Sequence, residues 1–163
     1  MLTLRYAAVV ALTLWVGGLV ALGAIAAPSI FDVSALRVEG PAGRLLAGAI
    51  FGETLRRFHL LTYAAAAVLL ISLLTRAVLG PRPRRFAVRV AIAFLMTAAT
   101  VYAGLVLAPR IGRTQAEIGA APSTLAETDP RRVEFERLHG ASSGLELVPL
   151  AGGLLLLFWE LKD

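Results

Sequence analysis

The chain has 163 residues, 58% of them hydrophobic, and its mean hydropathy of +0.76 is too high for an ordinary soluble domain. Cysteine is absent, which excludes disulfides, thiolate metal sites and cysteine nucleophiles. The net charge of +5 would suit a nucleic-acid partner, but its distribution along the chain indicates membrane topology instead, so no nucleic-acid binding is expected.

Four apolar blocks follow one another along the chain, at residues 6–27, 58–75, 90–108 and 147–159. A helix needs about 20 residues to cross the roughly 30 Å hydrocarbon core of a bilayer. The first three blocks meet that requirement, and the fourth meets it if residues 140–146 also lie in the membrane. Since only helices and closed barrels satisfy their backbone groups in lipid, we expect an all-α bundle of four transmembrane helices, forming a single integral membrane domain over residues 1–163.

Prolines and a capping residue predict where these helices begin and end. The first helix is expected to stop near Pro28 and the third at Ala108–Pro109, because proline interrupts a helix. Gly40–Pro41 and Asp129–Pro130 have the pattern of helix starts, the second with a capping carboxylate. Both of these starts lie well before an apolar block, so the second and fourth helices are expected to extend outside the membrane.

The connection between the second and third helices is basic and contains no acidic residue. The other two connections mix both signs of charge. Because positive residues concentrate on the cytoplasmic side, both termini and this connection are expected in the cytoplasm, with the protein in the bacterial inner membrane. The basic residues that carry this prediction are Arg76, Arg82, Arg84, Arg85 and Arg89, together with Arg5 and Lys162 near the termini.

Two helices carry polar stripes where they approach the membrane from the outer side. With a period of 3.6 residues, the second helix aligns Glu53, Arg56, His59, Thr62 and Tyr63, and the fourth aligns Arg132, Phe135, Glu136, His139, Ser142, Ser143 and Glu146. An ionisable residue at membrane depth marks a candidate functional site. The sequence therefore predicts a polar site between helices two and four near the outer face, formed by His59, His139, Ser142, Ser143 and Glu146, with Arg110 on the same side.

The only two histidines, His59 and His139, are expected at similar depth. Three interpretations stay open: hydrogen bonding at the interface, binding of a haem b or a metal ion between the two imidazoles, and proton or substrate handling together with Glu146. Neither an HExxH nor a CxxCH motif is present. The cofactor and the metal, if there is one, are thus left undefined.

Several sequence elements resemble the transmembrane protein 205-like family. They are WVGG at 15–18, LRRFH ending at His59, LAPR at 107–110 and, most specifically, DPRRVEFERLHGASS at 129–143. The resemblance covers nearly the whole chain and implies a four-helix membrane protein with little settled biochemistry. It also implies histidine at the positions of His59 and His139, and an amide where this chain has Glu146, which puts a required carboxylate there in doubt.

These observations favour a small integral membrane binding or accessory protein, working as a homo-oligomer or as a subunit of a larger membrane complex. One alternative is a haem- or metal-binding redox protein that uses His59 and His139. Another is a transporter or efflux factor with Glu146 in its path. An enzyme is the least supported class, because no nucleophile–base pair or phosphate-binding loop can be read in the sequence.

Overall fold

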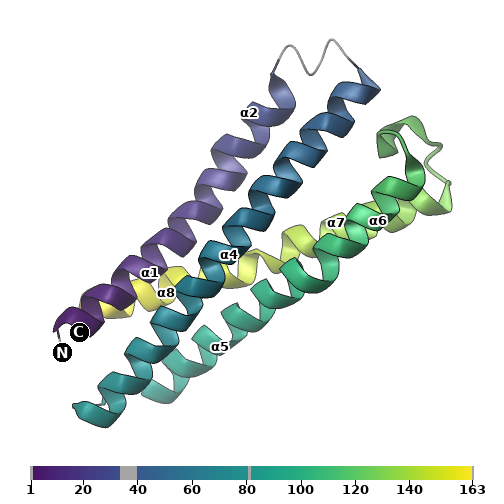
Figure 1. Ribbon diagram of the computed structural model, residues 1–163. Coiled ribbons are helices and arrows are strands. Elements are labelled where there is room, and N and C mark those ends of the chain that lie inside the picture. The colour runs from purple at the N-terminus through teal and green to yellow at the C-terminus, as the bar shows by residue number, and fades with distance from the viewer. Residues whose placement is uncertain (1, 34–39, 81, 163) are drawn as a thin grey trace.

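The computed structural model describes residues 2–33, 40–80 and 82–162, and within these ranges it contains helices and no strands. Four helical stretches are long and apolar enough to cross a membrane, judged by length and composition: Leu2–Asp32, Pro41–Leu79, Phe86–Ile118 and Pro130–Lys162. They run up and down, so that both termini and the connection between the second and third stretches lie at one end (Figure 1). For the described residues, the prediction of an all-α protein with four helices long and apolar enough to cross a membrane is confirmed.

Three of the four stretches are divided. The first consists of α1 (Leu2–Ala21), the π-helical turn η1 (Leu22–Ala26) and α2 (Ala27–Asp32). The second is the single helix α4 (Pro41–Leu79). The third consists of α5 (Phe86–Tyr102), the π-helical turn η2 (Ala103–Leu107) and α6 (Ala108–Ile118). A short 3₁₀ turn, η3 (Pro122–Thr124), lies in the connection that follows. The fourth stretch consists of α7 (Pro130–Leu145) and α8 (Leu147–Lys162).

The expected helix ends at Pro28 and at Ala108–Pro109 are wrong, because both helices continue past the proline. In each case a π-helical turn directly precedes it. The Ala27 N–H donates to the Leu22 carbonyl, and the Ala108 N–H donates to the Ala103 carbonyl. Such a turn contains one extra residue. The wider turn gives room to a ring that would otherwise clash with the carbonyl one turn earlier.

The two expected helix starts are confirmed. α4 begins with Pro41 directly after Gly40, whose φ of 57° is easily reached only by glycine. α7 begins with Pro130 after Asp129, and the Asp129 carboxylate accepts a hydrogen bond of 2.9 Å from the Arg131 backbone N–H. The guanidinium of Arg131 binds the same carboxylate and lowers the pKa of Asp129 below its usual range.

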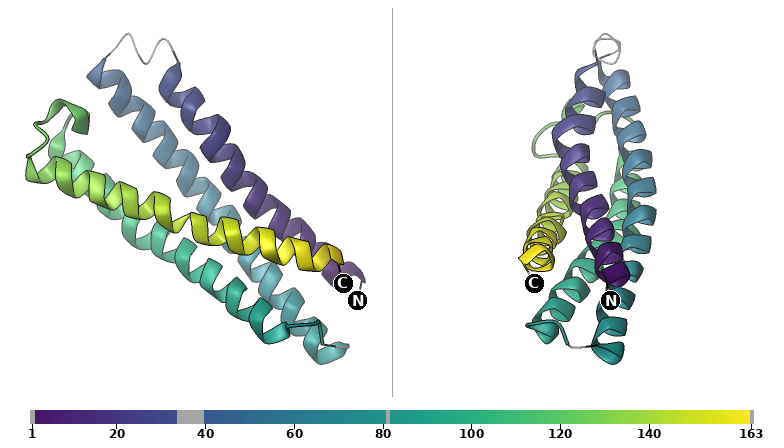
Figure 2. Two further views of the ribbon diagram at one scale, coloured as in Figure 1. Left: turned by 180° about the vertical axis from the view of Figure 1, so that it is seen from behind. Right: turned by 90° about the vertical axis from the view of Figure 1, so that its left-hand side faces the viewer.

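The helices form a closed ring at the end that holds the termini. There α1 packs against α4 and α8, and α5 packs against the same two helices (Figures 1 and 2). The buried core of this ring includes Leu12, Trp15, Leu69, Met96 and Leu156. This part of the bundle fixes the position of the helices relative to one another.

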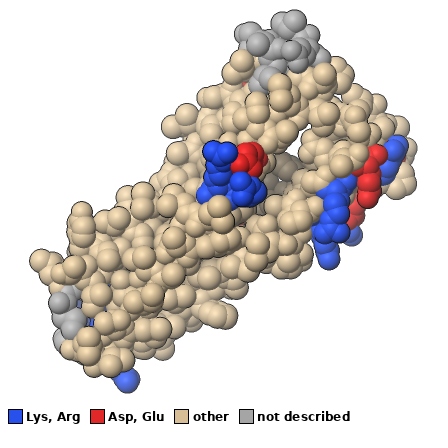
Figure 3. All heavy atoms as spheres, in the orientation of Figure 1, with Lys and Arg blue, Asp and Glu red and all other residues tan. Residues whose placement is uncertain are grey.

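At the opposite end the bundle separates into two helical pairs. One pair is α2 with the first half of α4, and the other is α6 with α7 (Figure 2). A hydrogen bond of 3.3 Å from Arg44 to the Ser123 hydroxyl links the pairs near their tips. The space-filling view shows a hollow between α4 and the α6–α7 pair, with charged groups on both sides (Figure 3).

Candidate functional site

His59 lies in the middle of α4, where the two helical pairs diverge from the ring. Its side chain is only 4% exposed, and the ring stacks on Tyr63 one turn later, with 6.2 Å between the centroids and 9° between the planes. The hydroxyl of Thr62 donates to the His59 carbonyl at 2.9 Å. α4 thus carries a histidine whose ring position is fixed by its own helix.

Glu146 lies at the interruption between α7 and α8. The interruption has a local cause, because Pro149 has no N–H to donate to the Leu145 carbonyl and its ring crowds that carbonyl. Glu146 caps the end of α7, where its backbone N–H reaches the carbonyls of Ser142 and Gly144. A carboxylate is therefore placed at a helix break, between the charged helix α7 and the apolar first part of α8.

These two side chains meet. Nε2 of His59 lies 3.3 Å from Oε1 of Glu146, a distance at which an imidazole N–H donates to a carboxylate. The Glu146 side chain is 20% exposed, so the pair is reached from outside on the Glu146 side. The other face of the imidazole packs on η2: a Cβ added to Gly104 would lie 2.9 Å from Nδ1 of His59 and would overlap the Tyr63 hydroxyl. Only glycine fits there.

The structure places the remaining residues of the predicted polar site outside this pair. Ser142 is buried between the helices, but Ser143 and Arg110 are exposed. His139 is also exposed, and its ring stacks on Phe135 with 5.9 Å between the centroids. Across the described part of the chain, no group of three histidine, cysteine or acidic side chains is placed to hold a metal ion.

A second buried group of charges, at the end of the ring, was missed by the sequence reasoning. Glu160 of α8 is 2% exposed, and it accepts hydrogen bonds from Arg89 of α5 at 2.5 Å and from Arg76 of α4 at 2.8 Å. Arg5 of α1 donates to the Glu160 backbone carbonyl at 2.9 Å. We call these four residues the Glu160 cluster. It joins all four helices of the ring through one side chain and one carbonyl.

Trp159 lies next to the Glu160 cluster. The guanidinium groups of Arg85 and Arg89 lie 5.4 and 5.7 Å from the centroid of its ring, within range of a cation–π interaction. Arg89 also donates to the carbonyls of Trp159 and Arg84. The signal available in the sequence was a carboxylate directly after the last apolar block, at the end where the basic connection between the second and third helices was expected.

Four apolar spans with ionisable side chains buried between them define an integral membrane protein. More particularly, the chain belongs to the family described as Domain of unknown function (DUF4149), whose family model matches residues 10–120. The matched segment contains His59, Gly104 and Arg89 but ends before α7, so it includes neither Glu146 nor Glu160. No curated protein and no solved structure matches the chain.

Proposed function

We propose that this protein is a small binding protein of the bacterial inner membrane, and that His59 and Glu146 form its ligand site. The proposal is carried by one observation: a nearly buried imidazole faces a carboxylate at 3.3 Å, at the point where the charged parts of α4 and α7 give way to the apolar second half of α4 and to α8. Ionisable groups are rare inside membrane spans because their burial is unfavourable. A pair held at a helix break, and partly exposed on the Glu146 side, is in a position to exchange partners with a ligand.

The chemistry of the pair favours a cationic ligand or one that donates hydrogen bonds. The Glu146 carboxylate is an acceptor, and it lies at the C-terminal end of α7, where the helix dipole is negative. Pro149 leaves the Leu145 carbonyl without its usual helical donor. Half-helix ends that coordinate cations inside interrupted spans are a recurring arrangement in membrane transporters.

The orientation of the protein in the membrane is part of the proposal. The positive-inside rule supports a cytoplasmic location for both termini and for the basic connection, which lie at one end of the bundle. The His59–Glu146 pair, on the far side of the ring, is then nearer the outer face. The resemblance of residues 129–143 to the transmembrane protein 205-like family concerns a segment beyond the family match, and we retain it as a proposal.

Transport is the second candidate function, because Glu146 is partly exposed at an interrupted span. Haem or metal ligation has less support from the geometry. Nε2 of His59 faces Glu146 and Nδ1 packs against Gly104, so a metal ion could reach this imidazole only if one of these contacts were broken. His139 lies on an exposed face with its ring on Phe135.

Labelling with dicyclohexylcarbodiimide, a reagent for carboxyl groups reachable from the lipid phase, tests the proposal. Glu146 should react, and its adduct should be identified by mass spectrometry of the digested protein. Glu160 is the internal control, because it is 2% exposed and bound by two arginines, and it should stay unmodified. Sodium, zinc and methylammonium ions are then added as probes of the cation site.

A bound probe should slow the labelling of Glu146 by about tenfold at nine times its dissociation constant. The variant His59→Gln should weaken that protection, because it removes half of the pair. If Glu146 is as unreactive as Glu160, or if none of the three ions slows its labelling, the pair is a structural contact and the binding function is refuted.

A further inference from the structure

The ring end of the molecule carries a strong excess of positive charge. The sequence places two acidic residues there, Glu160 and Asp163, of which Asp163 lies outside the described residues. Against them stand seven basic residues: Arg5, Arg76, Arg82, Arg84, Arg85, Arg89 and Lys162. A surplus of this size at the edge of a membrane-spanning bundle attracts anionic groups.

Part of this charge is held in a fixed arrangement. Glu160 orients Arg76 and Arg89, and the ring of Trp159 lies beneath the guanidinium of Arg85 at 5.4 Å. Arg85 itself is exposed and adopts a φ of 56°, unusual for a residue with a side chain, at the start of α5. Guanidinium groups present several N–H donors in a plane that matches phosphate oxygens.

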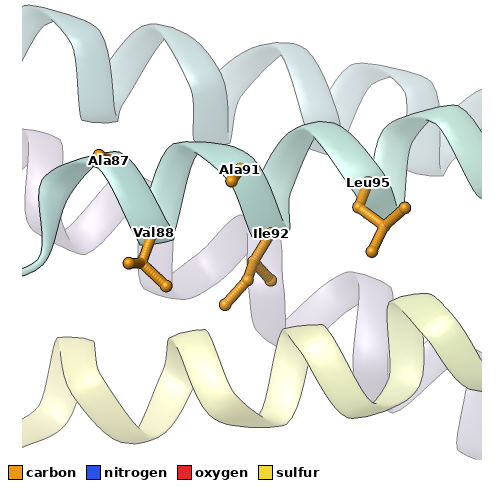
Figure 4. A pocket seen from close by; sticks show the side chains of 5 residues that line it. All are labelled: Ala87, Val88, Ala91, Ile92 and Leu95. Atoms are coloured by element: carbon orange, nitrogen blue, oxygen red, sulfur yellow. The ribbon is translucent and has the colours of Figure 1, made fainter.

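An apolar groove begins directly beside these arginines. It runs along α5, has a volume of about 380 Å³, and is lined only by apolar residues: Ala87, Val88, Ala91, Ile92 and Leu95. Figure 4 shows the side chains of Val88, Ile92 and Leu95 pointing from α5 toward α8. From Arg85 to Leu95 the helix rises about 15 Å at 1.5 Å per residue, which is close to half the roughly 30 Å hydrocarbon core.

We propose that this end of the protein binds one anionic phospholipid molecule, with its phosphate at the exposed Arg85, beside the Glu160 cluster, and one acyl chain in the groove of α5. The two halves of the site match the chemistry and the length of one lipid. Hydrogen-bond donors and positive charge lie at the membrane surface, and the apolar groove extends from them along α5 toward the middle of the bilayer. A zwitterionic lipid gains less, because its own positive group meets the same arginines. This inference rests on neither His59 nor Glu146.

Native mass spectrometry of the detergent-purified protein tests the inference, with phosphatidylglycerol and phosphatidylcholine of identical acyl chains as the two probes. Phosphatidylglycerol should bind at least about fivefold more tightly, since each arginine near the surface contributes about 1 kcal/mol of attraction to anionic lipid. Arg85→Gln should reduce that binding by about fivefold. The matched control Arg113→Gln removes an exposed arginine of α6 at the other end and should leave it unchanged.

A second variant tests the groove separately from the charge. Ala91 is exposed, so Ala91→Phe should fold normally, fill the groove and weaken phosphatidylglycerol binding. Inorganic phosphate at the same concentration should not displace the lipid. The inference is overturned if both lipids bind equally, if Arg113→Gln acts like Arg85→Gln, if Ala91→Phe has no effect, or if phosphate alone displaces phosphatidylglycerol.

Discussion

Gly104 determines how closely η2 approaches α4 at the His59–Glu146 pair. A Cβ at this position would lie 2.9 Å from Nδ1 of His59 and 3.1 Å from Cγ of the same ring, and would overlap the Tyr63 hydroxyl. Neither ring can shift away from η2 without disturbing another contact, because His59 also contacts Glu146 and stacks on Tyr63. The absence of a side chain at Gly104 is thus a condition for the pair.

We therefore expect Gly104→Ala to destabilise the protein by about 1–3 kcal/mol, the usual penalty for overpacking a filled site. Gly112→Ala is the matched control in α6, where an added Cβ meets nothing within 4 Å. Alanine is a better helix former than glycine, so the control should be neutral or more stable by about 0.5–1 kcal/mol. Thermal unfolding in detergent, followed by circular dichroism, measures both. Equal effects of the two variants would mean that η2 does not press on His59.

Glu160 allows a second prediction. Its carboxylate is buried with Arg76 and Arg89, and removing one partner of a buried ion pair leaves the other charges uncompensated. Glu160→Ala should therefore lower the free energy of unfolding by about 3–5 kcal/mol. The control is Glu53→Ala, which removes a carboxylate bound to Arg56 and Arg57 on an exposed face of α4. Unfolding in detergent should show little change for this control, and a loss at Glu53 as large as at Glu160 would contradict the assigned role of burial.

The two charged sites differ in how far the sequence could predict them. The stripes on the second and fourth helices pointed to His59 and Glu146, because the helical period fixes which residues share a face. The period does not fix how a helix is rotated against its neighbours. His139 and Ser142 were expected on the same stripe, yet Ser142 is buried and His139 is exposed. The contacts of Glu160 with Arg76 and Arg89 depend on the same packing between distant helices.

At the scale of single elements, prolines had different effects according to the turn before them. Pro28 and Pro109 follow π-helical turns and leave the helix continuous, whereas Pro149 follows an ordinary α-helix and coincides with the break at Glu146. The sequence shows the prolines but not the turns, because a π-helical turn depends on how the helix packs along its length. The two wrong helix ends have this cause.

Helix α8 is expected to tolerate a carboxylate in its apolar run much less well than the segment that precedes it. Leu155 is 40% exposed in an apolar run, on a surface that would face lipid. Leu155→Glu should impair membrane insertion by roughly 2.5–3.5 kcal/mol, the cost of a central acidic residue. Glu146→Leu should insert normally and lose only the contact with His59. The yield of folded protein in the membrane fraction and its unfolding in detergent measure both. Similar, mild effects would show that Glu146 has no special environment.

At the scale of the whole molecule, composition alone was enough to predict four helices that are long and apolar enough to cross a membrane. The order in which they pack was not predictable, because apolar blocks of similar composition can neighbour one another in several ways. The structure closes α1, α4, α5 and α8 into a ring at one end and separates two pairs at the other. The separation leaves the hollow in one half of the molecule, and the ring in the other half has the net positive charge, with the Arg89–Glu160 ion pair buried within it.

This division predicts the orientation of the bundle in the membrane. The natural chain has no cysteine, so a single introduced cysteine reports its own location without background. Arg82 and Thr128 are both exposed and lie in connections at opposite ends of the bundle. By the positive-inside rule, Thr128→Cys should react with a membrane-impermeant maleimide added to intact cells, whereas Arg82→Cys should react only after the membrane is permeabilised. The reverse pattern would place the His59–Glu146 pair on the cytoplasmic side and the Glu160 cluster on the outer side.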